Sequence, residues 1–176
     1  MPKVLMVIAQ KNFKDIEYFE PKEILQNNSI SVVTASLQLV TATGSDGRQT
    51  NVDLAVSYLL ADKARIAEYD AVIFIGGGGM AQLAQEAQFI ELAQAFFQAH
   101  KIVAAICVAP VLLANAGILR NKKATVFPDQ ESIDALVNSG AEYDGGELVV
   151  DGNIVTASGP KAAYKFGLEL VKILNK

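Results

Sequence analysis

The sequence contains one cysteine, Cys107, and its surroundings are typical of a nucleophile. Cys107 follows the apolar run 102–106 directly and precedes Pro110, which suits the first turn of a helix. This pattern predicts a thiol exposed at a sharp strand-to-helix turn, with a sparsely populated backbone conformation. A helix N-terminus favours a thiolate, so we expect a pKa below the free-thiol value of about 8.5. The same position also suits a buried, unreactive cysteine.

Glu17 is the natural partner of this thiol. It lies just after the first apolar run, in the stretch Phe13-Lys14-Asp15-Ile16-Glu17. A carboxylate and a thiolate repel each other, so one of the two should hold a proton. A protonated Glu17 would donate a hydrogen bond to the thiolate or move a proton during a reaction. Acidic residues are also favoured near helix starts, so Glu17 equally suits a solvated position.

Four glycines, Gly76 to Gly79, follow the apolar run 71–75. Glycines let the backbone approach a ligand and present N–H groups to an anion or an oxyanion. The stretch formally matches the G-x-G-x-x-A pattern of dinucleotide sites. It lies deep in the chain, however, and no acidic residue ends a following strand, which argues against such a site. A tight turn without a ligand role stays open.

The only histidine, His100, is seven residues before Cys107, at the far end of the same predicted strand. A strand rises about 3.3 Å per residue, so roughly 20 Å should separate the two side chains. We therefore expect no Cys–His dyad within one chain and interpret His100 as a surface loop residue.

Alternating apolar runs and amphipathic stretches predict the elements that position these residues. Within the helix predicted at 14–27, Pro21 should mark a start or a kink. Residues 45–47 should form the turn of an antiparallel hairpin, and residues 151–152 that of a second. The predicted strands are 4–9, 30–35, 39–42, 50–56, 71–75, 102–106, 124–127, 147–150 and 153–156, and the predicted helices are 14–27, 62–68, 88–99, 111–116, 131–139 and 161–174.

This order predicts a doubly wound α/β fold with a mostly parallel sheet and helices on both faces. We see no linker or repeat, so one domain over residues 1–176 is the economical interpretation. Ligands of such folds bind at the carboxyl ends of the strands. Glu17, Gly77 and Cys107 should meet at that edge.

The composition excludes several classes of binding partner and indicates the cellular compartment. The chain of 176 residues is 51% hydrophobic with a net charge of −4 and no basic cluster, which argues against nucleic acid and anionic membranes. A lone cysteine cannot form an internal disulfide, which fits a reducing compartment. One cysteine and one histidine also argue against a zinc site. The apolar run 4–9 is too short for a signal peptide or a membrane span, so we expect a cytoplasmic protein.

Five stretches, in this order, resemble the ThiJ/PfpI (DJ-1) superfamily, and together they cover nearly the whole chain. They resemble the family's first strand, its F-x-D-x-E signature, its Y-D-x-x-x-x-P-G-G segment, its A-A-I-C-x-G-P elbow and its T-S-x-G-P segment. Any one of them is weak, but the ordered set is specific. The stretches are 3–9, 13–17 followed by Pro21, 69–77, 104–110 and 156–160.

The resemblance implies a flavodoxin-like sheet of the class I glutamine amidotransferase type, a homodimer and no cofactor or metal. It implies that Cys107 and Glu17 are the catalytic residues. The backbone N–H groups of Gly77 and Val108 would stabilise an oxyanion. Residues of the surrounding pocket would be Gly76, Ala109 and Phe127.

The sequence departs from the family pattern at four positions. Ile75 replaces the proline before the glycines, and Ala109 replaces the elbow glycine. Val108 stands where peptidase-like members carry histidine, and Phe127 stands where DJ-1-like members carry one. Chemistry that needs an imidazole base must therefore use Glu17 or water.

Three functions follow from the resemblance. The first is a cofactor-independent glyoxalase or deglycase that acts on methylglyoxal-like dicarbonyls, with a small carbonyl compound as substrate. The alternative is an oxidative-stress sensor or binding protein whose Cys107 oxidises to a sulfinate, and the missing histidines favour it somewhat. The third is an intracellular cysteine peptidase or amidase. It is the least supported, because no histidine is available to protonate a leaving amine.

Overall fold

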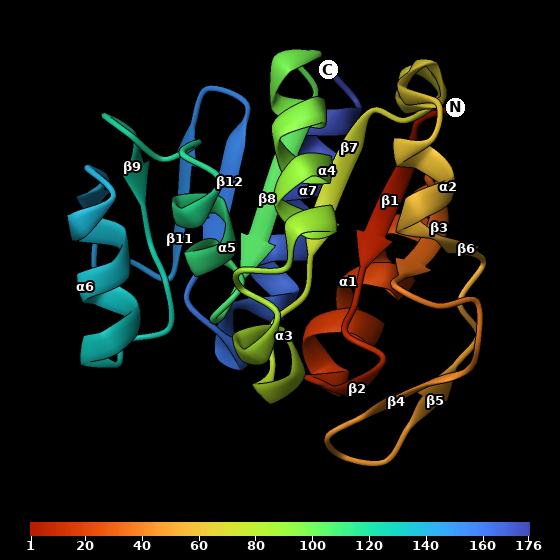
Figure 1. Cartoon of the computed structure of the whole chain (residues 1–176), viewed down its shortest axis with the longest axis horizontal. Coiled ribbons are helices and arrows are strands. Elements are labelled where there is room, and N and C mark those ends of the chain that lie inside the picture. Colours follow the sequence, from red (N-terminus) through yellow and green to blue (C-terminus); the bar gives the residue numbers. More distant parts are fainter.

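A seven-stranded sheet forms the centre of the computed structural model, which describes all 176 residues (Figure 1). Its strand order is β11-β12-β8-β7-β1-β3-β6, and every neighbouring pair is parallel except β11 and β12. The predicted mostly parallel α/β fold is confirmed. The strands are β1 (Lys3–Val7), β3 (Ser31–Ser36), β6 (Leu54–Ala55), β7 (Ala71–Phe74), β8 (Ile102–Ile106), β11 (Leu148–Asp151) and β12 (Ile154–Ala157).

Helices cover both faces of this sheet. Helices α1 and α7 pack against each other on one face, and α4 and α5 lie on the other (Figure 1). No helix is both long and apolar enough to span a bilayer. The helices are α1 (Asp15–Asn27), α2 (Val56–Leu60), α3 (Gly78–Gln82), α4 (Ala87–Gln98), α5 (Pro110–Asn115), α6 (Gln130–Asn138) and α7 (Ala163–Leu174), with 3₁₀ turns at Lys63–Glu68 and Pro160–Ala162.

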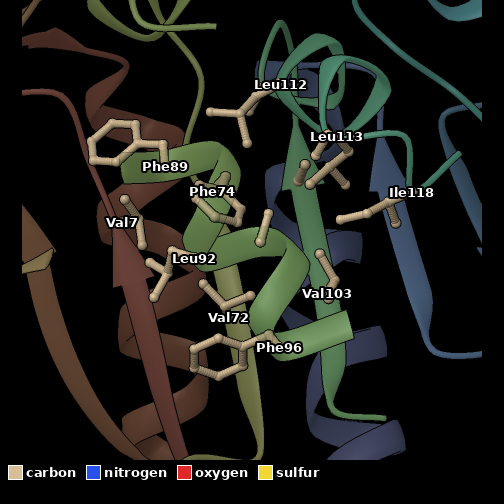
Figure 2. Packing of buried hydrophobic residues seen from close by; sticks show 14 of the residues in the cluster. Val7, Val72, Phe74, Phe89, Leu92, Phe96, Val103, Leu112, Leu113 and Ile118 are labelled. Carbon is tan, nitrogen blue, oxygen red and sulfur yellow. The ribbon is translucent and has the colours of Figure 1, made fainter. Parts of the chain in front are cut away.

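The central strands read as unbroken apolar runs because both of their faces are buried. Along β1, Leu5 and Val7 join the core cluster beneath α4, while Val4 and Met6 join the cluster beneath α1 and α7. Figure 2 shows the first of these clusters, with aromatic rings of α4 over the side chains of β7. Successive side chains of each central strand thus enter two different apolar layers.

Helix α1 does not begin at Pro21, one of the two outcomes expected from the sequence. It starts at Asp15 and continues through Pro21 to Asn27. Pro21 is buried where α1 approaches Gly167 of α7. Packing against α7 thus stabilises the helix around Pro21, although proline has no N–H to donate to the helix.

The first predicted hairpin is shorter than expected, although its turn at 45–47 is confirmed. Strand β4 (Ala42–Gly44) pairs with β5 (Gln49–Thr50), and β4 also pairs in parallel with β2 (Lys11–Phe13). Residues 54–55 instead form the sheet edge strand β6, and α2 follows, a helix that the sequence did not predict. The Asp53 carboxylate accepts from the Thr34 N–H at 2.7 Å, which draws this segment to β3.

The strand predicted at 124–127 is also shorter. Only β9 (Lys123–Ala124) is a strand, and it pairs with β10 (Glu142–Tyr143) in a separate two-stranded sheet. The Phe127 N–H donates to the carbonyl oxygen of Cys107 at 2.8 Å instead of to a strand. The chain is thereby diverted towards the cysteine.

Asp15 anchors the loop between β4 and β5. Its carboxylate is only 3% exposed and accepts from the backbone N–H groups of Asp46 at 2.8 Å and Arg48 at 3.0 Å. A Cβ at Gly44 would lie 2.1 Å from Asp15 Oδ2, so glycine is required for this approach. One buried carboxylate therefore joins the start of α1 to the hairpin.

We predict that Asp15→Ala lowers the free energy of unfolding by roughly 2–4 kcal/mol, because two charge-assisted hydrogen bonds are lost. Chemical denaturation measures this change, and amide hydrogen exchange should accelerate at Asp46 and Arg48. The control is Asp46→Ala, which removes only an exposed ion pair with Lys14 and should cost less than about 1 kcal/mol. Equal losses in the two variants would contradict the anchor.

Candidate active site

Cys107 occupies a sharp turn between β8 and α5. Its φ of 65° lies in the left-handed region, which is uncommon for a residue with a side chain. The Cys107 N–H donates to Ala157 of β12 at 2.9 Å, and its carbonyl accepts from Phe127 at 2.8 Å. The predicted strained backbone is confirmed, and hydrogen bonds from two neighbouring segments hold it in place. The predicted exposure of the thiol is wrong, because the surrounding segments leave Cys107 only 7% exposed.

Glu17 lies beside this elbow and has no solvent exposure. The two residues meet across Gly76, which follows β7. A Cβ at Gly76 would lie 2.6 Å from Cys107 Cβ and 2.6 Å from Glu17 Oε2. The solvated alternative for Glu17 is therefore wrong, and Gly76 is small because the thiol and the carboxyl occupy the space around it.

Burial dominates the electrostatics of Glu17. Loss of hydration raises its pKa to about 7, and the nearby Cys107 thiol, the Gly76 N–H and the Lys14 ammonium offset only part of that rise. Neither carboxyl oxygen makes a hydrogen bond of normal geometry. Glu17 is thus poised to gain or lose a proton near neutral pH.

The Cys107 thiol is weakly acidic, contrary to the expectation from its place before a helix. Burial raises the pKa of Cys107 to about 12, and the negative charge of the neighbouring Glu17 adds to this rise. Helix α5 is only six residues long and begins at Pro110, three residues beyond the sulfur, so its N-terminus compensates little. The local sequence pattern does not reveal these two larger effects.

The two acids titrate as a pair. With pKa values of about 7 and about 12, the pair holds a single proton over the intervening pH range. In that range the carboxylate is the base nearest to the thiol. A thiolate forms when Glu17 accepts the proton of Cys107, which makes Glu17 a built-in base.

Backbone N–H groups complete the surroundings of the sulfur. Those of Val108 and Gly77 face Cys107 and lower its pKa in part. Gly77 has a φ of 108°, and a Cβ there would lie 2.5 Å from the backbone nitrogen of Lys14. The Lys14 N–H donates to the Gly76 carbonyl at 3.0 Å, which ties the start of α1 to the glycine turn. Lys14, whose charge also reaches Glu17, was not identified from the sequence.

The remaining predicted residues lie in different surroundings. Ala109 is fully buried in the core cluster beneath α4, whereas Phe127 is 39% exposed, with its ring near Gly159. His100 lines a pocket with Asp70 and Ile173 at the opposite edge of the sheet. No set of three or more histidine, cysteine, aspartate or glutamate side chains is arranged to hold a metal ion.

Comparisons with known proteins find relatives that match nearly the whole chain. An uncharacterised protein of Methanocaldococcus jannaschii is 41% identical over 175 residues, covering 99% of this chain and 83% of that protein. A deglycase of Pyrococcus horikoshii is 34% identical over 173 residues, covering 98% of this chain and 99% of the deglycase. The crystal structure of a ThiJ/PfpI domain protein from Brachyspira murdochii superposes with a TM-score of 0.91 at 35% identity, covering 98% of this chain and 96% of that one.

The DJ-1/PfpI family model matches residues 2–173, which include both the Glu17 helix and the Cys107 elbow. The match therefore spans every element that builds the site, and the chain belongs to the DJ-1/PfpI family.

Proposed function

We propose that this protein is a cofactor-independent enzyme of the glyoxalase or deglycase type that acts on methylglyoxal-like dicarbonyls. The observation that carries the proposal is the buried pair of Cys107 and Glu17 across Gly76. A nucleophile beside a carboxyl group that titrates near pH 7 suits proton transfer between carbon and oxygen. The deglycase of Pyrococcus horikoshii, similar over almost its whole length, supports the same reaction class.

The first step forms a covalent adduct. Glu17 accepts the thiol proton while the Cys107 sulfur bonds to the aldehyde carbon. The electron pair of the C=O bond moves to oxygen. The N–H groups of Gly77 and Val108, which face the sulfur in the free protein, stabilise this oxyanion. Proton return from Glu17 gives a neutral hemithioacetal.

The second step moves hydrogen between adjacent carbons. Glu17 removes the proton from the former aldehyde carbon, and the neighbouring carbonyl oxygen takes a proton to give an enediol. The neighbouring carbon then takes a proton while the hydroxyl on the sulfur-bonded carbon loses one and becomes a carbonyl. The product is a thioester of Cys107. Water cleaves the C–S bond, which releases a 2-hydroxy acid and restores the thiol. Substrate and water together account for every atom of the product, so no redox cofactor is required.

The two other functions receive less support. A redox sensor needs a thiolate in the resting protein, and burial beside Glu17 opposes that state. A peptidase needs an acid for the leaving amine, and Val108 and Phe127 occupy the positions where histidine would serve. His100 lies at the opposite edge of the sheet.

The proposal also covers the oligomeric state, the cellular compartment and the class of partner. Family membership supports a homodimer of one-domain subunits spanning residues 1–176. A free cysteine in a chain of net charge −4 supports a reducing cytoplasm and a small-molecule substrate rather than nucleic acid or a membrane.

We predict that hydroxy acid formation from methylglyoxal rises with pH through a midpoint of about 7, because only ionised Glu17 accepts the thiol proton. The glutamine of Glu17→Gln cannot accept the thiol proton. This substitution should lower kcat by roughly 100-fold or more and abolish the rise in rate near pH 7. Rates between pH 5.5 and 9 measure both effects. The control is Glu23→Gln, an exposed glutamate of the same helix, which should keep the native profile. A rise in rate near pH 7 that persists in Glu17→Gln would refute the role of Glu17 as the base.

We also predict that Gly76→Ala abolishes turnover, because its Cβ would lie 2.6 Å from Cys107 Cβ and from Glu17 Oε2. The matched control is Gly78→Ala two residues further on, where an added Cβ meets no atom within 4 Å. Circular dichroism at the assay temperature should show both variants folded. Native turnover in a folded Gly76→Ala protein would show that the close pair is unnecessary.

A further inference from the structure

A groove of about 540 Å³ opens beside the cysteine elbow, between α3, α5 and α6. Apolar residues such as Val108 and Val111 and residues with amide or carboxylate groups line it. The lining residues are Ala81, Gln82, Ala84, Gln85, Val108, Val111, Asn115, Asp129, Glu131, Ser132 and Ala135.

The groove adjoins the cysteine elbow through Val108. Val108 lines it, and the N–H of the same residue faces the Cys107 sulfur. On the α6 side, the Asp129 N–H donates to Phe127 at 2.8 Å, and the Phe127 N–H donates to Cys107 at 2.8 Å. These contacts place the groove next to the elbow.

The charge of the groove is entirely negative. No lysine, arginine or histidine lines it. Both Asp129 carboxylate oxygens accept from Ser132, through its N–H at 2.8 Å and its hydroxyl at 2.9 Å, so Asp129 is already engaged as the cap of α6. Glu131 is exposed and makes no ion pair or side-chain hydrogen bond with the protein. Its carboxylate is the one free charge that a ligand in the groove would meet.

The amide side chains add directional polarity. The Asn115 side-chain N–H donates to the Ala84 carbonyl at 2.7 Å, which fixes the amide and leaves its oxygen as an acceptor. Gln82 and Gln85 are exposed on the facing wall. Acceptor oxygens with a free carboxylate match a planar cation that carries several N–H donors.

We propose that this groove binds the substituent of the dicarbonyl substrate and that Glu131 selects cationic substituents over anionic ones. The preferred class is 2-oxoaldehydes with an amidinium or guanidinium group at the end distant from the aldehyde. This inference rests on the proposed function for the position of the reacting carbon, whereas the cation preference rests on the groove.

The test compares three aryl glyoxals that carry a para amidinium, no charged group or a para carboxylate. In the native protein, kcat/KM should fall in that order. Glu131→Gln should raise KM for the amidinium compound roughly three- to ten-fold, which is the range of one partly exposed ion pair, and leave kcat unchanged. It should leave the uncharged compound unaffected and improve the carboxylate compound.

The control variant is Glu142→Gln, an exposed glutamate of β10 outside the groove, which should leave all three values unchanged. Glu131 also lies in the first turn of α6, where an acidic residue favours the helix. A purely structural role would lower the melting temperature and would affect all three compounds alike. That result, or an unchanged preference in Glu131→Gln, would overturn the proposal.

A binding measurement separates this inference from the proposed function. Cys107→Ala protein should bind benzamidine more tightly than benzoate, by NMR shifts centred on Val111 and Ala135, and Glu131→Gln in that background should remove the difference. A native protein that turns over none of these dicarbonyls, with this binding difference intact, would refute the proposed function alone. Turnover of methylglyoxal without any benzamidine preference would refute the groove alone.

Discussion

A carboxyl group and a thiol that share one buried proton are the constraint on which the rest of this structure depends. Water is kept from Glu17 completely and from Cys107 almost completely. Two negative charges cannot coexist there, so ionisation of one group keeps the other neutral. The nucleophile is consequently formed at the moment of reaction by transfer to Glu17, rather than stored as a thiolate.

The pair is costly to the fold. A pKa of Glu17 raised from 4.5 to about 7 means that ionising the carboxyl destabilises the native state by about 3 kcal/mol. Protonated Glu17 therefore contributes its full stabilisation below pH 4.5, and this stabilisation is lost as the pH rises through about 7. Hydrogen bonds of the surrounding backbone stabilise the folded state around the pair in spite of this cost. The Lys14 N–H bond to Gly76 and the two hydrogen bonds of the Cys107 backbone fix the segments that hold the pair together.

Much of the fold was predictable because its signals are local. Runs such as 4–9 and 102–106 contain no polar residue, which is typical of strands buried on both faces. The elements that the sequence predicted wrongly are defined by contacts between residues distant in the sequence. Asp53 bonds to Thr34 and creates the edge strand β6, and Phe127 bonds to Cys107 rather than continuing β9. Sequence periodicity carries no trace of such contacts.

The site shows the same division. The positions of Glu17, Gly77 and Cys107 at one sheet edge followed from the order of strands, and the strained elbow followed from the strand-to-helix turn. The weak acidity of the thiol did not, because it depends on burial and on the charge of the neighbouring Glu17 carboxylate. A helix N-terminus is visible in a sequence, whereas desolvation becomes visible only when α1 is packed against the elbow.

The most direct test is a carbon-13 NMR titration of the Glu17 carboxyl carbon in glutamate-labelled protein, with Glu17→Gln identifying the resonance. Shared protonation predicts a midpoint of about 7 for this carbon, with the Cys107 β-carbon unchanged through that range. A midpoint near 4.5 would show that the carboxyl is solvated and cannot act as the base. A Glu17 signal that stays protonated while Cys107 ionises would show that the thiolate is stored in the resting protein, and would contradict the account.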